Sequence, residues 1–296
     1  MVEYLLGNYL VKQGKITKDQ LEEVIAKQDE TRVKMGLLAV TEGIMTVEQA
    51  ESVNRLQASM DKRFGDIAVE KGYLTEEQIS NLLKKQGNAY LAFAQALVNA
   101  DMLTLQELEE MLDGFQQENG FSKSDMEDIR SDEPERIVPL YLPPEALACK
   151  DIVGVMIRTL IRCVNRHVYI GKARIGETLS VGKSAFQKMV GFTAPVGGCR
   201  EIETGFAEEN GGLRAIASAY CKEEELDEED LLDAAGELLN CVNGLFVSGL
   251  SRSGIDSELL PPIEMSQPSV LKQTGVCSIP VKIKDKEALF IIMGRK

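Results

Sequence analysis

The first 116 residues are organised by an internal repeat with a step of 29 residues. Two sets of positions keep this step: Gly7, Gly36, Gly65 and Ala94, and then Thr17, Thr46, Thr75 and Thr104. Each threonine is followed three positions later by glutamine or glutamate, which is the capping box that begins a helix. Each unit is predicted to be a short helix, a tight turn and a longer capped helix. Because one unit alone cannot bury its apolar face, four units should stack into an all-α domain over residues 1–116.

The third unit carries a more specific pattern, made of Arg63-Phe64-Gly65, Ala68, Gly72, Leu74, Ile79, Leu82 and Gln86. This pattern resembles the motif of the MshE N-terminal domain, which is related to the N-terminal region of type II secretion ATPases. In that family two tandem copies bind cyclic di-GMP. The resemblance therefore implies two such domains here, with nucleotide-binding roles for Arg63, Gly65, Gly72 and Gln86.

The other units depart from this pattern at the ligand positions. Where the third unit has Arg63, the others have Leu5, Lys34 and Ala92, and the fourth unit has Phe115 in place of the closing glutamine. A strongly acidic chain offers no compensating positive charge to a dianionic dinucleotide. Two interpretations stay open for residues 1–116: a cyclic di-GMP site, or a helical domain that docks a protein partner or acts as a spacer.

Residues 116–144 break the helical pattern with Asn119-Gly120 and with Pro134, Pro139, Pro143 and Pro144. Such residues mark turns and solvated chain. We therefore expect an acidic linker at residues 117–137 and a domain boundary near residue 130. A short acidic helix is expected inside it, with Ser122 or Ser124 as the N-cap.

The remaining chain mixes helical and strand patterns. A broad apolar face predicts a helix over residues 147–168, and another helix should begin near Gly212 and close at Tyr220. Strands are expected at residues 188–194, 201–206, 275–283 and 288–293, the last two as a hairpin. Pro280 places its strand at a sheet edge or a bulge. The expected class is α+β, with long helices packed on a mostly antiparallel sheet.

Residues 230–251 read as one helix with two different faces. Leu231, Ala235, Leu238, Val242 and Leu245 recur at steps of four and three, which predicts a buried stripe. The opposite face carries Asp233, Glu237, Asn240, Gly244 and Ser248. A helix interior that accepts both asparagine and glycine suggests that something approaches this face closely.

Glu237-Leu238-Leu239-Asn240, followed by Asn243-Gly244, resembles the E-x-x-N helix of the CheC/CheX/FliY chemotaxis phosphatases, nearest the CheX type with its single motif. The resemblance covers residues 138–296 and includes the acidic lead-in 227–230 and the stretch 265–270 with Gly275. Glu51-Ser52-Val53-Asn54 has the same spacing without that surrounding pattern.

The resemblance implies hydrolysis of the aspartyl phosphate of a CheY-like receiver domain. Glu237 would pair with a lysine of the receiver and Asn240 would orient the attacking water. Asp233 and Gly244 would contact the partner, which brings its own Mg²⁺, and the protein itself would need no cofactor. CheX-type domains also imply a homodimer. The alternative, from another class, is a non-catalytic adaptor that binds a receiver or, through the repeats, a cyclic dinucleotide or protein. A third interpretation is a phosphatase gated by cyclic di-GMP.

Composition and charge exclude several general classes of function and location. The 296 residues carry a formal net charge of −14, which argues against general nucleic-acid or anionic-membrane binding. No apolar run approaches the length of a membrane span, and the first residues lack a signal-peptide pattern. Six scattered cysteines without C-x-x-C predict reduced thiols in the cytoplasm and no metal site. The single histidine, His167, has no partner motif and is expected to be structural.

Overall fold

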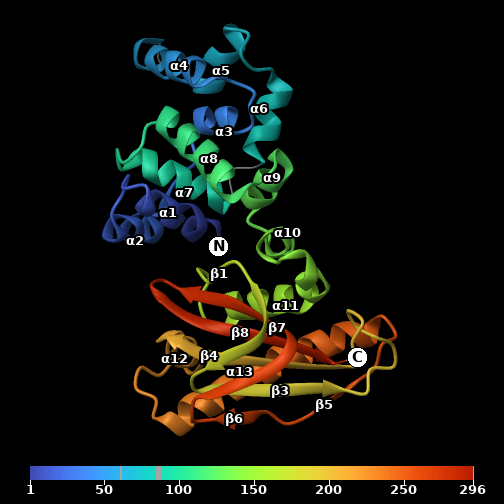
Figure 1. Ribbon diagram of the computed structural model, residues 1–296. Coiled ribbons are helices and arrows are strands. Elements are labelled where there is room, and N and C mark those ends of the chain that lie inside the picture. Colours follow the sequence, from blue (N-terminus) through green and yellow to red (C-terminus); the bar gives the residue numbers. More distant parts are fainter. Residues whose placement is uncertain (61, 85–87, 296) are drawn as a thin grey trace. The chain divides into compact units, whose positions relative to one another are not determined.

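The computed structural model describes residues 1–60, 62–84 and 88–295, and of residues 29 and 58–60 only the backbone (Figure 1). These residues form two compact units, Val2–Asp132 and Glu133–Lys296. In its described part the first unit contains helices and no strand, whereas the second combines helices with one antiparallel sheet. The all-α and α+β classes predicted for the two regions are confirmed.

The first unit is a succession of short helices joined by tight turns. Its elements are α1 (Val2–Lys12), α2 (Lys18–Lys27), η1 (Gln28–Glu30), α3 (Met35–Thr41), α4 (Val47–Met60), α5 (Phe64–Glu70), α6 (Glu76–Leu83), α7 (Ala89–Asn99), α8 (Leu105–Asn119) and α9 (Lys123–Ser131).

The threonines predicted to begin helices do so. Thr17, Thr75 and Thr104 cap α2, α6 and α8 with reciprocal capping boxes, and Thr46 exchanges the same two bonds with Gln49 before α4. The short helices end in left-handed residues, with φ between 53° and 70° at Gly14, Gly43, Gly72 and Asp101. Local sequence therefore sets these helix boundaries, while the organisation of residues 1–116 as four copies of one 29-residue repeat stays a prediction.

Residues 116–144 are more helical than the sequence predicts. Ser122 caps α9 with a capping box, and Met126 and Ile129 on that helix are buried. The short helix predicted here is confirmed, with Ser122 as its N-cap. Its predicted solvation is wrong, because Met126 and Ile129 join the core of the first unit. The second unit then begins with three short elements, α10 (Pro134–Ile137), η2 (Val138–Tyr141) and η3 (Pro144–Cys149).

The second unit is built on a curled antiparallel sheet in the order β1-β7-β8-β4-β3-β5, with β2 paired to β7 and β6 paired to β3. Its longer helices are α11 (Lys150–Cys163), α12 (Gly212–Cys221) and α13 (Glu228–Arg252). Its strands are β1 (Tyr169–Ile170), β2 (Arg174–Val181), β3 (Ser184–Val190), β4 (Glu201–Asn210), β5 (Glu258–Leu259), β6 (Ile263–Met265), β7 (Ser269–Ile283) and β8 (Lys286–Arg295).

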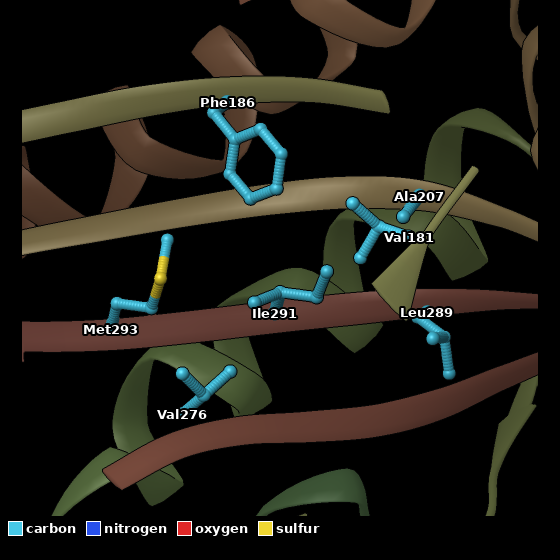
Figure 2. Packing of buried hydrophobic residues seen from close by; sticks show 7 residues of the cluster. All are labelled: Val181, Phe186, Ala207, Val276, Leu289, Ile291 and Met293. Atoms are coloured by element: carbon cyan, nitrogen blue, oxygen red, sulfur yellow. The ribbon is translucent and has the colours of Figure 1, made fainter. Parts of the chain in front are cut away.

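The two faces of the central strands bury different groups. The face away from α13 packs seven apolar side chains together, as Figure 2 shows: Val181, Phe186, Ala207, Val276, Leu289, Ile291 and Met293. Gly205 lies opposite Phe186, and a Cβ at Gly205 would come within 2.3 Å of the Phe186 ring. On the other face, the rings of Phe206 and Phe290 are in contact, with their centroids 5.1 Å apart. Because side chains alternate along a strand, the neighbours of Phe186 point to the helix-covered face.

Several predicted boundaries in this unit are wrong. The helix predicted over 147–168 is α11, and the preceding residues form η3 instead. The strand predicted at 188–194 is β3, which begins four residues earlier, and β1, β2, β5 and β6 escape prediction because they are short or lack alternation. Pro280 is not on an edge strand, since β7 pairs with β8 on one side and with β1 and β2 on the other. Its carbonyl accepts the Gly171 N–H at 2.8 Å between β1 and β2, where the ladder is interrupted and a missing N–H is tolerated.

Candidate active site on helix α13

Helix α13 packs against β3 and carries the candidate site. Asp227 begins the helix, since its side chain accepts a hydrogen bond from the N–H of Asp230 at 2.9 Å. Acidic residues in the first turn also suit the positive end of the helix dipole. The predicted buried stripe is confirmed for four of its residues, each at most 3% exposed: Leu231, Ala235, Leu238 and Val242.

Leu245 does not belong to that stripe, because its side chain is 45% exposed. It lines a groove of about 730 Å³ between α11 and the last turns of α13, together with Arg158, Arg162 and Arg252. Helical periodicity alone cannot tell that the last turns of α13 border a groove. Neither Glu237 nor Asn240 lines this groove.

The predicted catalytic pair lies on an open surface of α13. Asp233, Glu237 and Asn240 are all exposed, and their spacing of four and three residues places them on one face of the helix. One turn further on, Gly244 adds no side chain, and a Cβ there would meet nothing within 4 Å. This geometry suits a macromolecular partner that lies across the helix.

A buried polar network lies beneath Asn240. The Nε2 atom of Gln187, on β3, donates to Oδ1 of Asn240 at 2.7 Å. The Oε1 atom of Gln187 accepts from Nδ2 of Asn243 at 2.9 Å, and Oδ1 of Asn243 accepts from the hydroxyl of Thr204 at 2.9 Å. Gln187, Thr204 and Asn243 are each at most 1% exposed. Asn240 is therefore the exposed end of a hydrogen-bonded chain that starts inside the unit.

Sequence reasoning missed Gln187 and Thr204 and gave Asn243 no role. The predicted strand began at residue 188, so Gln187 fell just outside it. Two signals were present in the sequence: a glutamine among apolar residues of a buried strand, and a second asparagine one turn after Asn240. Neither signal shows by itself that the residues meet, because β3 and α13 are about 50 positions apart in the chain.

The surroundings of Glu237 are acidic. Partial burial, followed by the carboxylates of Glu223, Glu237, Asp233 and Asp230, raises the pKa of the Cys221 thiol on α12. Partial burial, followed by Asp233 and Glu229, likewise raises the pKa of the Glu264 carboxyl on β6. Within the described part of the chain, neither Asp233 nor Glu237 forms an ion pair with lysine or arginine. The face thus offers unneutralised negative charge to a basic partner.

The residues predicted to bind a nucleotide lie around the short helix α5. Arg63 is its exposed N-cap. Gly65 faces Ile79, whose Cδ1 would lie 3.0 Å from an added Cβ. Gly72 follows the helix with a φ of 70°, and Gln86 lies outside the described residues. Helix packing and turn formation account for the two glycines, and a nucleotide-binding role stays a prediction.

Over residues 1–60, 62–84 and 88–295, no three histidine, cysteine or acidic side chains are grouped so that they could hold a metal ion. None of the described helices combines the length and apolar character needed to cross a membrane.

Comparison with known proteins gives one family match. Residues 189–292 match the family model described as chemotaxis phosphatase CheX. This region is CheX-like. The match contains Glu237 and Asn240 and begins two residues after Gln187. No curated protein matches the chain.

Several solved structures are similar to about half of the chain, and three of them follow. The CheX chemotaxis protein of Desulfovibrio desulfuricans has 17% identity and a TM-score of 0.42, over 50% of this chain and 99% of its own. CheX of Vibrio vulnificus has 19% identity and a TM-score of 0.37, over 49% and 97%. The CheX–CheY–BeF₃–Mg²⁺ complex of Borrelia burgdorferi has 16% identity and a TM-score of 0.40, over 50% and 98%.

The predicted CheX-like character of the C-terminal region is therefore confirmed over residues 189–292. The resemblance of the N-terminal repeats to MshE finds no support in these comparisons. Cyclic di-GMP binding and a homodimer both stay predictions.

Proposed function

We propose that the second unit, which contains the CheX-like residues 189–292 and is called the CheX-like unit below, hydrolyses the aspartyl phosphate of a CheY-like receiver domain. The observation that carries the proposal is the exposed pair Glu237 and Asn240 on one face of α13, inside the residues that match the CheX family model. An exposed, acidic helix face suits a substrate that is itself a folded protein.

The proposed reaction needs few catalytic groups from this chain. An acyl phosphate is already activated, and catalysis of phosphoryl transfer depends on positioning and on charge stabilisation. The water oxygen forms a bond to phosphorus, the bond between phosphorus and the aspartyl oxygen breaks, and the carboxylate leaves. One proton of the water passes to the phosphate product or to solvent, and the other stays on the oxygen that is now bound to phosphorus. The receiver would supply the Mg²⁺ that neutralises the phosphoryl oxygens.

The two residues have separate roles in this proposal. Asn240 holds the attacking water in line, which a carboxamide can do by forming a directed hydrogen bond to it. Glu237 pairs with a lysine of the receiver, and Asp233 adds negative charge to the same face. Gly244 leaves room for the partner to approach the helix.

The test is phosphate release from a phosphorylated CheY-like receiver, measured with and without the full chain and with the Asn240→Ala variant. We expect the wild-type chain to accelerate release and the variant to lose about 100-fold or more in kcat, as removal of one positioned hydrogen-bonding group usually does. Asn240 is exposed, so the variant should fold, which its circular dichroism would check.

The contrary outcome separates the two function classes. If wild type binds the receiver but does not accelerate phosphate release, the unit is an adaptor. We propose that the first unit, Val2–Asp132, called the helical unit below, regulates or localises this activity. Calorimetry with cyclic di-GMP tests the nucleotide version of this proposal, which fails if no heat is seen at high micromolar ligand.

A further inference from the structure

The polar network beneath Asn240 is unusual in its placement. A buried glutamine, threonine and asparagine cost stability unless their polar atoms are hydrogen-bonded. Here Gln187 from β3, Thr204 from β4 and Asn243 from α13 bond to one another, and the chain ends at a residue that solvent reaches. The network therefore connects the interior of the unit to the candidate site.

One backbone carbonyl fixes the direction of every bond in this network. The Gln187 amide atom that lies 2.7 Å from Asn240 also lies 2.9 Å from the carbonyl oxygen of Leu260. A carbonyl oxygen only accepts, so this atom must be the nitrogen Nε2. It then donates to Asn240 as well, and the Asn240 atom that it contacts must be the oxygen Oδ1. The Asn240 amide nitrogen is consequently left facing outward.

The opposite end of the Gln187 amide agrees with this assignment. Its oxygen Oε1 must accept, and the neighbouring Asn243 offers Nδ2 at 2.9 Å. Oδ1 of Asn243 then accepts from the Thr204 hydroxyl, which has a proton to give. Each bond has one donor and one acceptor in this arrangement, and flipping any one amide would set two like atoms against each other.

We propose that Gln187 is a positioning residue that holds the Asn240 carboxamide with its oxygen inward and its NH₂ group outward. The inference rests on the proposed phosphatase function for its kinetic consequence. Asn240 then presents a hydrogen-bond donor to the attacking water. The water oxygen accepts that bond with one lone pair and keeps the other for phosphorus.

The helical unit contains a matched control. Gln95 on α7 is 2% exposed, accepts from the Lys34 N–H at 2.9 Å and donates to Oδ1 of Asn99 at 3.0 Å. Asn99 is exposed, as Asn240 is. Gln95→Met thus removes a buried glutamine that is bonded to an exposed asparagine, in a unit without the candidate site.

The experiment compares Gln187→Met with Gln95→Met in the full chain. We expect Gln187→Met to lower kcat for receiver dephosphorylation by about tenfold with KM unchanged, the size expected when one held side chain regains its rotamers. In the Asn240→Ala background the same change should cause no further loss. Gln95→Met should leave kcat at the wild-type value. Wild-type kcat in Gln187→Met, or equal losses in both variants, would overturn the proposal.

Two further measurements keep the inference testable if Gln187→Met does not fold or if wild type shows no turnover. Asn240→Asp changes only an exposed side chain and replaces the outward NH₂ by oxygen, so it should lower kcat as much as Asn240→Ala. Wild-type kcat in Asn240→Asp would show that the outward donor is not used. Side-chain ¹⁵N relaxation of Asn240 needs no substrate, and its NH₂ group should be rigid in wild type.

The kinetic and relaxation measurements together distinguish failure of the positioning by Gln187 from failure of the proposed phosphatase function. A rigid Asn240 NH₂ group in a chain without phosphatase activity would overturn the function and leave the positioning by Gln187 intact. A mobile Asn240 NH₂ group in an active chain would overturn the positioning and leave the function.

Discussion

The two units carry the same E-x-x-N spacing in different settings. Glu51 and Asn54 lie on α4 in the helical unit, and Glu237 and Asn240 lie on α13 in the CheX-like unit. All four side chains are exposed. The sequence pattern and its local helical structure are therefore the same in both places.

The surroundings of the two pairs differ. On α4, Glu51 lies 3.7 Å from Arg55 of the same helix, so its charge is partly neutralised locally. Asn54 makes no side-chain hydrogen bond among the described residues. On α13, Glu237 has no such cation and Asn240 is held by Gln187 from the sheet. A motif of two residues becomes a candidate site only where a second element supports it from below.

Charge reversal should separate the two pairs most strongly. If Glu237 meets a lysine of the receiver, Glu237→Lys places like charges together and should weaken binding of a beryllofluoride-activated receiver on the order of 100-fold. Glu51→Lys makes the same charge change on α4 and should leave affinity unchanged. Isothermal titration calorimetry measures the affinity of both variants for the receiver. Equal weakening in Glu237→Lys and Glu51→Lys would show that net charge, not position, governs binding.

Removal of a residue from the polar network beneath Asn240 is the next largest expected effect, and it should lower the free energy of unfolding. Asn243→Ala leaves the Gln187 oxygen and the Thr204 hydroxyl buried without a partner, so it should lower the free energy of unfolding by about 2 kcal/mol. Asn54→Ala removes only an exposed side chain and should change it by less than about 0.5 kcal/mol. Denaturant unfolding followed by circular dichroism gives both values. Similar values for the two variants would mean that the network does not stabilise its unit.

The smallest expected effect concerns the electrostatic field around Glu237. Partial burial and then nearby carboxylates, Glu237 among them, raise the pKa of Cys221, which lowers its thiolate fraction near pH 8. Glu237→Gln removes one negative charge, so the pKa should fall and alkylation of Cys221 should quicken by about twofold, since charges near a surface are well screened. Glu51→Gln is the control. An unchanged rate, read by mass spectrometry of the Cys221 peptide, would place Glu237 too far away to act on this thiol.

Local patterns predict the helical unit well and the sheet less well. Thr17, Thr75 and Thr104 begin helices as expected, because a capping box satisfies backbone groups within four residues. Strand β2 escaped prediction, because it is stabilised by pairing with β7 about a hundred residues later. Leu245 fits the apolar stripe by period but faces a groove, since periodicity does not say where packing against α11 ends.

The sequence by itself determined the helix, the spacing of Glu237 and Asn240 and their exposure on its polar face, since these depend on residues within a few turns of one another. Only the tertiary structure decided that Gln187 lies beneath Asn240. That contact needs the alternation along β3 to point Gln187 toward α13, and it needs Leu260 to fix which way the amide turns. Hydrogen-bond direction between residues distant in sequence depends on how strands and helices pack, and no local pattern encodes it.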